Sequence, residues 1–155
     1  MTLQLQRILL PTDFSDHSSA AKTYASALAS RFDAELHVLH ILEQYYSLTP
    51  DFALGLALPR TISESKDLAK TKLSTFLDPQ WIGCRNVVHQ VVDGSPKAEI
   101  VRYARDQTID LIVMSTHGRS ALAQVMIGSV AESVVRTAPC PVLTVRPQGH
   151  QFVMP

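Results

Sequence analysis

Short apolar runs and amphipathic stretches alternate along the chain. Five runs are too short for helices and apolar at most positions, which is typical of strands buried on both faces of a sheet. They are "RILL" (7–10, ended by Pro11), "AELHVLHIL" (34–42), "CRNVVHQVV" (84–92), "DLIVM" (110–114) and "PVLTVR" (141–146). The pattern therefore predicts five strands.

The stretches between these runs predict four helices, because their apolar residues recur at three- and four-residue spacing. They cover 15–32, 61–77, 95–106 and about Ser129 to Arg136. Ser15 or Asp16 is available to cap the first helix. In the third, the Ser95 side chain is expected to accept a hydrogen bond from the first turn, and Pro96 needs no donor there. Strands alternating with helices predict an α/β fold, a parallel sheet with helices on both faces.

One domain is expected over residues 1–155. The chain has the length of an ordinary domain, and it shows no internal repeat, low-complexity segment or linker. The stretch from Glu43 to Arg60 is apolar but broken by Pro50, Gly55 and Pro59, so it is assigned no element.

Composition narrows the classes of partner and compartment. Lys and Arg number 14, Asp and Glu also 14, and no basic run occurs, so neither nucleic acid nor an anionic membrane is an expected partner. Cys84 and Cys140 form no CxxC pair, which favours a reducing compartment without disulfide or zinc. The start of the chain has no basic segment followed by an apolar core, and no span of about 18 apolar residues occurs. We expect a soluble cytoplasmic protein.

Candidate chemistry lies where the strands end, because ligands of open α/β sheets bind outside the carboxyl ends of the strands. "PTDFS" with Asp13 follows the first strand, and "STHG" follows the fourth. Gly118 lets the backbone approach a ligand closely, and Gly128-Ser129 lies where a helix is expected to begin, which favours phosphate binding. Alternatively, Gly118 closes a turn and Gly128 relieves crowding at a helix entry. The spacing alone leaves both readings open.

The stretches "ILLPTDFS", "HVLHIL" and "STHG", nine residues, "GSVAESVVRTAPCPVLTVR" together resemble the universal stress proteins of the adenine-nucleotide-binding type. The resemblance extends from about Arg7 to Pro147. Nucleotide-binding members carry glycine, two residues, glycine, nine residues, then glycine with serine or threonine. Gly118, Gly128 and Ser129 fit this motif, whereas the first glycine position is Ser115. That serine either crowds the phosphate side or donates a hydrogen bond.

The resemblance also implies the architecture and the nucleoside side of the site. The family's strand order is 3-2-1-4-5, a Rossmann-like arrangement that places the first and fourth strands side by side. Pro11, Thr12 and Asp13 would border the nucleoside, with Asp13 accepting from ribose hydroxyls; its alternative role is a turn or helix-capping aspartate. Backbone groups at Ile41 would read the adenine edge.

On the phosphate side, the resemblance implies contacts from the glycine loop and the following helix. Arg119 would pair with a phosphate and His117 would contact the ligand, although both are also ordinary surface residues. Met126 and Val130 would flank the pocket, although both are also ordinary core residues at a helix entry. His37 and His40 point to opposite faces of their strand and are not expected to share a metal.

The resemblance implies a protein that binds ATP or AMP, with Mg²⁺ arriving alongside the nucleotide, and that acts in stress adaptation through a protein partner not yet named. Family members commonly form homodimers through the last strand, here from Val142 to Arg146. Two alternatives stay open: a dimeric scaffold without nucleotide binding, and a slow ATPase. Neither GxxxxGK[ST] nor GxSxG occurs, so an enzyme is not the expected class.

Overall fold

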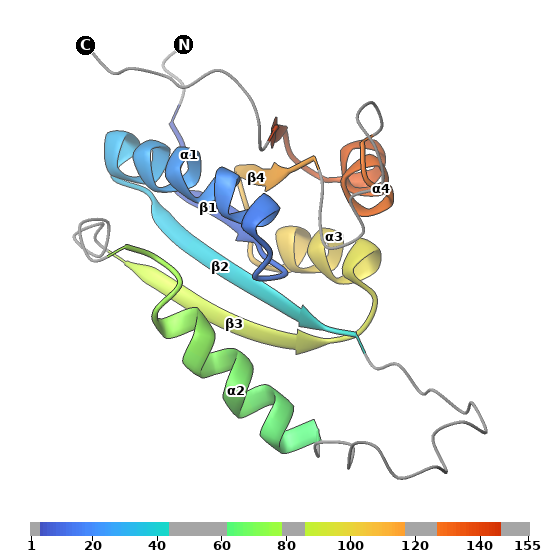
Figure 1. Cartoon of the computed structure of the whole chain (residues 1–155). Coiled ribbons are helices and arrows are strands. Elements are labelled where there is room, and N and C mark those ends of the chain that lie inside the picture. Colours follow the sequence, from blue (N-terminus) through green and yellow to red (C-terminus); the bar gives the residue numbers. More distant parts are fainter. Residues whose placement is uncertain (1–3, 44–61, 79–85, 117–126, 147–155) are drawn as a thin grey trace, which may run out of the picture.

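The computed structural model describes residues 4–43, 62–78, 86–116 and 127–146. Strands and helices alternate over these ranges (Figure 1). The elements are β1 (Arg7–Pro11), α1 (Asp16–Phe32), β2 (Glu35–Leu42), α2 (Ile62–Ser74), β3 (Val87–Asp93), α3 (Pro96–Asp106), β4 (Leu111–Ser115), α4 (Ser129–Thr137) and β5 (Val142–Val145). The expected sequence of elements is confirmed, with bounds shifted by up to three residues.

The five strands form one parallel sheet in the order β3-β2-β1-β4-β5, which confirms the predicted architecture. β1 is the central strand, with Leu9 opposite His37 of β2 and Ile112 of β4. The chain moves outward from β1 through β2 to β3, then returns to the other side of β1 for β4 and β5. The strand order thus reverses beside β1.

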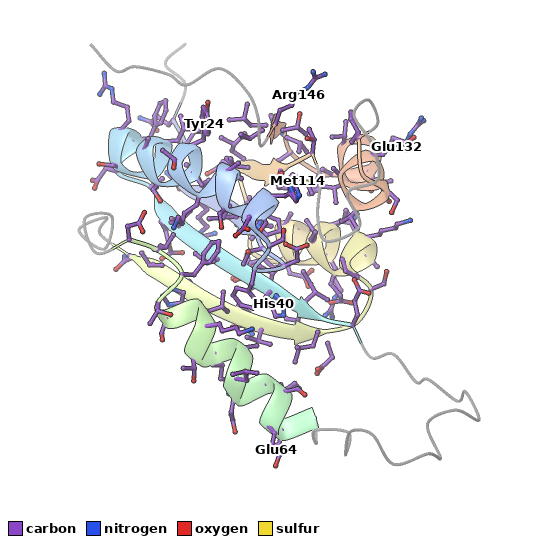
Figure 2. The ribbon with its side chains drawn as sticks, in the orientation of Figure 1. Tyr24, His40, Glu64, Met114, Glu132 and Arg146 are labelled. Atoms are coloured by element: carbon purple, nitrogen blue, oxygen red, sulfur yellow. The ribbon has the colours of Figure 1, made fainter. Side chains whose placement is uncertain are left out.

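Each face of the sheet carries its own apolar cluster, because neighbouring residues of a strand point to opposite sides. On one face, strand residues such as Ile8 and Val38 pack against α1 and α2. The other face is covered by α3 and α4 (Figure 1), and Leu9 and Leu39 pack against these two helices. Glu64 of α2 and Glu132 of α4 point outward from their helices, away from the sheet (Figure 2). Both faces are therefore covered, as the alternation of strands and helices predicted.

A stripe of small residues brings α1 close to the sheet. Ala21, Ala25 and Ala29 lie one helical turn apart and are fully buried. The helix begins after Ser15, whose hydroxyl accepts a hydrogen bond from the Ser18 N–H at 3.1 Å. Ser15, and not Asp16, is thus the capping residue. The helix ends at Asp33, which adopts a left-handed conformation with φ of 56°.

Two local expectations were wrong. The second helix ends at Ser74, three residues before the predicted end; there the Phe76 N–H bonds back to Leu73 in a turn at 3.1 Å. α3 begins at Pro96 as predicted, but the Ser95 side chain makes no capping hydrogen bond. The Ser95 carbonyl oxygen instead accepts from the N–H groups of the first turn. Within the described residues, no helix is long and apolar enough to cross a membrane.

Candidate functional site

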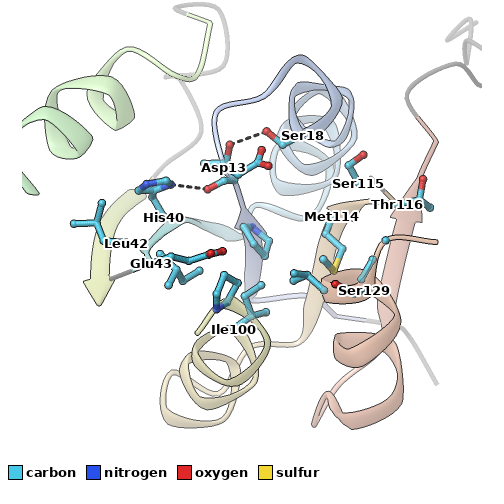
Figure 3. A pocket seen from close by; sticks show the side chains of 17 residues that line it. Asp13, Ser18, His40, Leu42, Glu43, Ile100, Met114, Ser115, Thr116 and Ser129 are labelled. Carbon is cyan, nitrogen blue, oxygen red and sulfur yellow. Dashed lines mark hydrogen bonds between the residues drawn. The ribbon is translucent and has the colours of Figure 1, made fainter. Parts of the chain in front are cut away.

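A pocket of about 400 Å³ opens where the strand order reverses (Figure 3). Its wall is built from the carboxyl ends of β1, β2 and β4 and from the first turns of α1, α3 and α4. The described lining residues are Pro11, Thr12, Asp13, Ser18, His40, Ile41, Leu42, Glu43, Pro96, Ile100, Met114, Ser115, Thr116, Gly128, Ser129, Val130 and Ala131. This is the position at which open α/β sheets bind their ligands.

The sequence-predicted site residues converge on this pocket as far as the structure describes them. Those that line it are Pro11, Thr12, Asp13, Ile41, Ser115, Gly128, Ser129 and Val130. They come from three strand ends and one helix start, and they are spread over residues 11–130 of the chain. His117, Gly118, Arg119 and Met126 lie outside the described residues. Residues of one binding site must line the same pocket, and these eight residues do so.

Thr12 is fixed by hydrogen bonds within the protein. Its N–H donates to the Leu39 carbonyl at 2.9 Å, and its hydroxyl oxygen accepts from the Phe14 N–H at 3.0 Å. The same hydroxyl lies 3.0 Å from the Ser18 hydroxyl, which itself donates to the Ser15 carbonyl. Because a serine has a single hydroxyl proton, Thr12 is the donor to Ser18. Thr12 therefore joins the end of β1 to the first turn of α1.

Asp13 follows Thr12 and shapes the turn into α1. Its Oδ1 accepts from the Ser15 N–H at 3.0 Å and from the Ser15 hydroxyl at 2.6 Å. This is an Asx turn, in which an aspartate bonds to the backbone two residues on. The turn role considered for Asp13 is thus real, and the same carboxylate also lines the pocket. The turn role is compatible with a contact to a ligand, because a carboxylate has two oxygens and about four acceptor positions.

The loop after β1 contains a strained residue. Phe14 has φ of 62°, in the left-handed region that a non-glycine residue enters at a cost of roughly 1–3 kcal/mol. Its ring packs on His40, with ring centroids 4.3 Å apart, and it meets the Phe76 ring in a T-shaped arrangement with centroids 5.9 Å apart. The Lys72 ammonium lies 5.6 Å from the centre of the Phe14 ring. These contacts stabilise the strained turn beside Asp13.

The start of α4 offers donors to the pocket. The first N–H groups of any α-helix have no acceptor within the helix, and the N-cap residue here, Gly128, has no side chain with which to cap them. Ser129, Val130 and Ala131 follow and line the pocket. Gly128 itself is anchored to the end of β4, its N–H donating to the Thr116 carbonyl at 2.7 Å. A helix start of this kind favours an anion.

Charge in the described part of the pocket is acidic. Asp13 and Glu43 carry carboxylates, and none of the described lining residues is a lysine or arginine. Among the described residues of the chain, no group of three His, Cys, Asp or Glu side chains is placed to hold a metal ion. Within the described part of the lining, the donors open to an anionic group are therefore backbone N–H groups and hydroxyls.

Sequence reasoning missed several lining residues. Ser18 and His40 are buried polar residues that face the pocket from α1 and β2 (Figure 3). Ile100 and Met114 supply apolar wall. Glu43 follows β2 directly, at the carboxyl end where polar residues were sought, and its position was the available signal. The others belong to no motif. An isolated serine, histidine or isoleucine inside a helix or strand is typical of the core, so the residue type offered no reason to place it in a site.

The fold and the pocket define an α/β protein with a ligand site at the switch point of a parallel sheet. The model of the universal stress protein family matches residues 4–146, nearly the whole chain. The chain belongs to the universal stress protein family. It is 33% identical over 144 residues to the universal stress protein MJ0531 of Methanocaldococcus jannaschii, covering 91% of this chain and 82% of that protein.

Solved structures show the same fold. The universal stress protein UspA from Lactobacillus plantarum is 30% identical, with a TM-score of 0.73 and coverage of 94% of this chain and 100% of the other. A universal stress protein solved in complex with cAMP is 26% identical, with a TM-score of 0.61 and coverage of 94% and 100%. The predicted family and strand order are both confirmed.

Proposed function

We propose that this protein binds an adenine nucleotide, ATP or AMP, in the pocket beside β1 and serves as a nucleotide-responsive module in stress adaptation. The observation that carries the proposal is the meeting of the Asp13 carboxylate and the uncapped start of α4 in one pocket. The related structure that holds cAMP supports an adenine nucleotide as the ligand class.

Different parts of the pocket lining match the base, the ribose and the phosphate of a nucleotide. Pro11, Ile41, Ile100 and Met114 provide apolar surface for a flat base. Asp13 offers acceptor oxygens to the ribose hydroxyls, which are donors. The N–H groups of Ser129 and the following residues, with the Ser129 hydroxyl, face a phosphate. Hydroxyls and phosphates thus have chemically matched partners.

The acidic lining bears on the phosphate chain. With carboxylates at Asp13 and Glu43, a free polyphosphate would meet repulsion that a Mg²⁺-bound polyphosphate or a monophosphate would largely escape. We therefore include Mg²⁺ with ATP in the proposal. The ion would be held by the phosphates and water, since Mg²⁺ usually keeps several waters and binds through substrate phosphates.

The proposal includes a homodimer formed through the outer strand β5. An outer strand leaves N–H and C=O groups on one side without partners in its own sheet, and pairing with a second copy satisfies them. Leu143 of β5 is 38% exposed, so the strand also presents apolar surface. Pro141 lies directly before β5 and sets the limit of the pairing segment.

Titration calorimetry tests the proposal. Purified protein, stripped of any ligand it carries, is titrated with AMP, with ATP and with ATP plus Mg²⁺. We expect saturable binding in the micromolar range, with ATP binding more tightly when Mg²⁺ is present. No heat and no saturation by any of them, from a folded and dimeric sample, would reject nucleotide binding and favour the dimeric scaffold. Repeated phosphate release per protein would instead favour the slow ATPase.

A further inference from the structure

His40 is a buried histidine at the pocket, and one of its ring nitrogens is fixed by the loop after β1. It is 6% exposed, lies on the α1 and α2 side of β2, and lines the pocket (Figure 3). Its Nδ1 lies 2.8 Å from the carbonyl oxygen of Thr12. A carbonyl oxygen only accepts, so Nδ1 carries the proton and donates.

The same ring supports the strained residue of the loop. Phe14 packs on His40 with ring centroids 4.3 Å apart and planes tilted by 33°. His40 therefore contacts the loop on both sides of Asp13, by a hydrogen bond to the residue before it and by ring contact with the residue after it. A left-handed Phe14 persists only when its surroundings over-determine it, and His40 supplies one of those contacts, beside Phe76 and Lys72.

We infer that His40 is a positioning residue for Asp13. It holds the loop so that the Asp13 carboxylate faces the ligand, and its Nδ1–H bonds to the Thr12 carbonyl and not to the ligand. The inference rests on the proposed nucleotide function. The backbone of Asp13 is bracketed at Thr12 and Phe14 by His40, and its side chain is oriented by Ser15. A loss of the His40 contacts frees the bracketed backbone, so the carboxylate no longer has one fixed direction.

The chain supplies a matched control in His37. It lies on the same strand, is 3% exposed and has both ring nitrogens in hydrogen bonds, to Tyr103 at 2.9 Å and to Glu35 at 2.7 Å. It points to the opposite face, packs beside α3 and does not line the pocket. Replacing either histidine by phenylalanine removes a buried imidazole from β2. Of the two, only His40 contacts Thr12 and Phe14, the residues on either side of Asp13.

The experiment combines nucleotide titration with amide hydrogen exchange. The variants are His40→Phe, which keeps a ring under Phe14 but loses the donor, His40→Asn, whose amide restores a donor near Nδ1, and His37→Phe. Asp13→Ala and the double variant with His40→Phe complete a mutant cycle. Exchange is followed at the Phe14 and Ser15 amides, which donate to Thr12 and Asp13 in the loop.

We expect His40→Phe to weaken AMP binding about tenfold, His40→Asn to recover most of that loss, and His37→Phe to change it less than twofold. The double variant should bind no more weakly than Asp13→Ala alone, because the histidine acts through the aspartate. The Phe14 and Ser15 amides should exchange faster in His40→Phe and not in His37→Phe.

Contrary outcomes separate the two proposals. Equal losses of affinity in His40→Phe and His37→Phe, or additive losses in the double variant, would overturn the positioning role. If the wild-type protein binds no nucleotide, the proposed function fails, and the exchange comparison still decides whether His40 fixes the loop. Unchanged exchange at Phe14 and Ser15 in a folded His40→Phe protein, which lacks the donor to Thr12, would overturn it without any ligand.

Discussion

The amide of Gly128 donates a hydrogen bond to the carbonyl oxygen of Thr116 at 2.7 Å, which fixes the start of α4 to the end of β4. Gly128 has φ of −59° and ψ of 150°, a conformation that any residue adopts. A glycine is therefore not demanded by the backbone at this point. What a larger residue would change is the space in the pocket that Gly128 lines.

This relationship predicts the behaviour of Gly128→Val. The backbone and its bond to Thr116 can be retained, so the free energy of unfolding should fall by only about 1 kcal/mol, the usual scale of a poorer N-cap residue. Nucleotide affinity should fall by about tenfold or more, because the new side chain stands where the phosphate would approach. Urea unfolding and calorimetry measure the two quantities. A large loss of stability with unchanged affinity would show that the glycine serves helix entry alone.

The observed turn role of Asp13 and its proposed ligand role can be tested separately. Asp13→Asn keeps an oxygen that can accept from Ser15 but removes the charge, so the turn is retained. We expect a loss of nucleotide affinity of about tenfold, since hydrogen bonds to a charged group are the stronger ones. Calorimetry with AMP measures it.

The control for Asp13 is Ser15→Ala, which removes the helix cap and one hydrogen bond to Asp13. It should lower the free energy of unfolding by about 1 kcal/mol and leave affinity within about threefold of the wild type. If the two variants lowered affinity equally, the turn, and not the carboxylate charge, would be what the ligand requires.

The outer strands offer a paired test of dimerisation. Leu143→Lys places a charge on β5, whereas Gln90→Lys places one on β3, the strand at the other edge of the sheet. Two copies paired through β5 would bring the new lysines together, so Leu143→Lys should shift the protein toward monomer. Sedimentation velocity at micromolar concentration measures this. Dissociation caused by Gln90→Lys alone would place the interface at β3.

The pKa of Tyr103 predicts a stability change at high pH. Burial, followed by the nearby carboxylate of Glu35, raises the pKa of Tyr103 above its ordinary value of 10.0. As pH rises through about 10, the unfolded chain loses this proton while the folded chain keeps it, so the folded state loses relative stability. The wild-type protein should therefore lose unfolding free energy more steeply than Tyr103→Phe above this pH.

Urea unfolding at pH 8 and pH 10.5 measures the difference. At pH 8, Tyr103→Phe should be less stable by about 1 kcal/mol, because it lacks the hydrogen bond to His37. The gap between the two proteins should narrow at the higher pH. Parallel losses in both would mean that ionisation of Tyr103 does not differ between the folded and unfolded states.

The elements were predictable because their periodicity is a local property. Buried strands such as β1 and β4 are apolar at nearly every position, and Pro96 marks a helix start whatever surrounds it. The strand order came from the family resemblance, because no local pattern states which strand lies beside β1. Ser95 was misjudged for a related reason: whether its hydroxyl or its carbonyl meets the first turn depends on the backbone path, which the residue type does not reveal.

The pocket was predictable where residues belonged to a motif or to a strand end. Asp13, Gly128 and Ser129 were found in this way. His40 was not, because a histidine on a largely apolar strand gives no sign of its partner, the Thr12 carbonyl, 28 residues earlier in the chain. Ser18 likewise belongs to a helix whose start was predicted, but its contact with Thr12 arises only when α1 folds back on β1.

The alanine stripe of α1 belongs to the same helix that supplies part of the pocket wall. Ala29, near its far end, is 1% exposed, and Ser18, in its first turn, forms part of the pocket wall about 16 Å away along the helix axis. A valine at Ala29 would overpack the contact between α1 and the sheet, and overpacked cores respond by shifting side chains and backbone. The small side chain of Ala29 therefore belongs to the close packing of the same helix whose first turn carries Ser18 to the pocket.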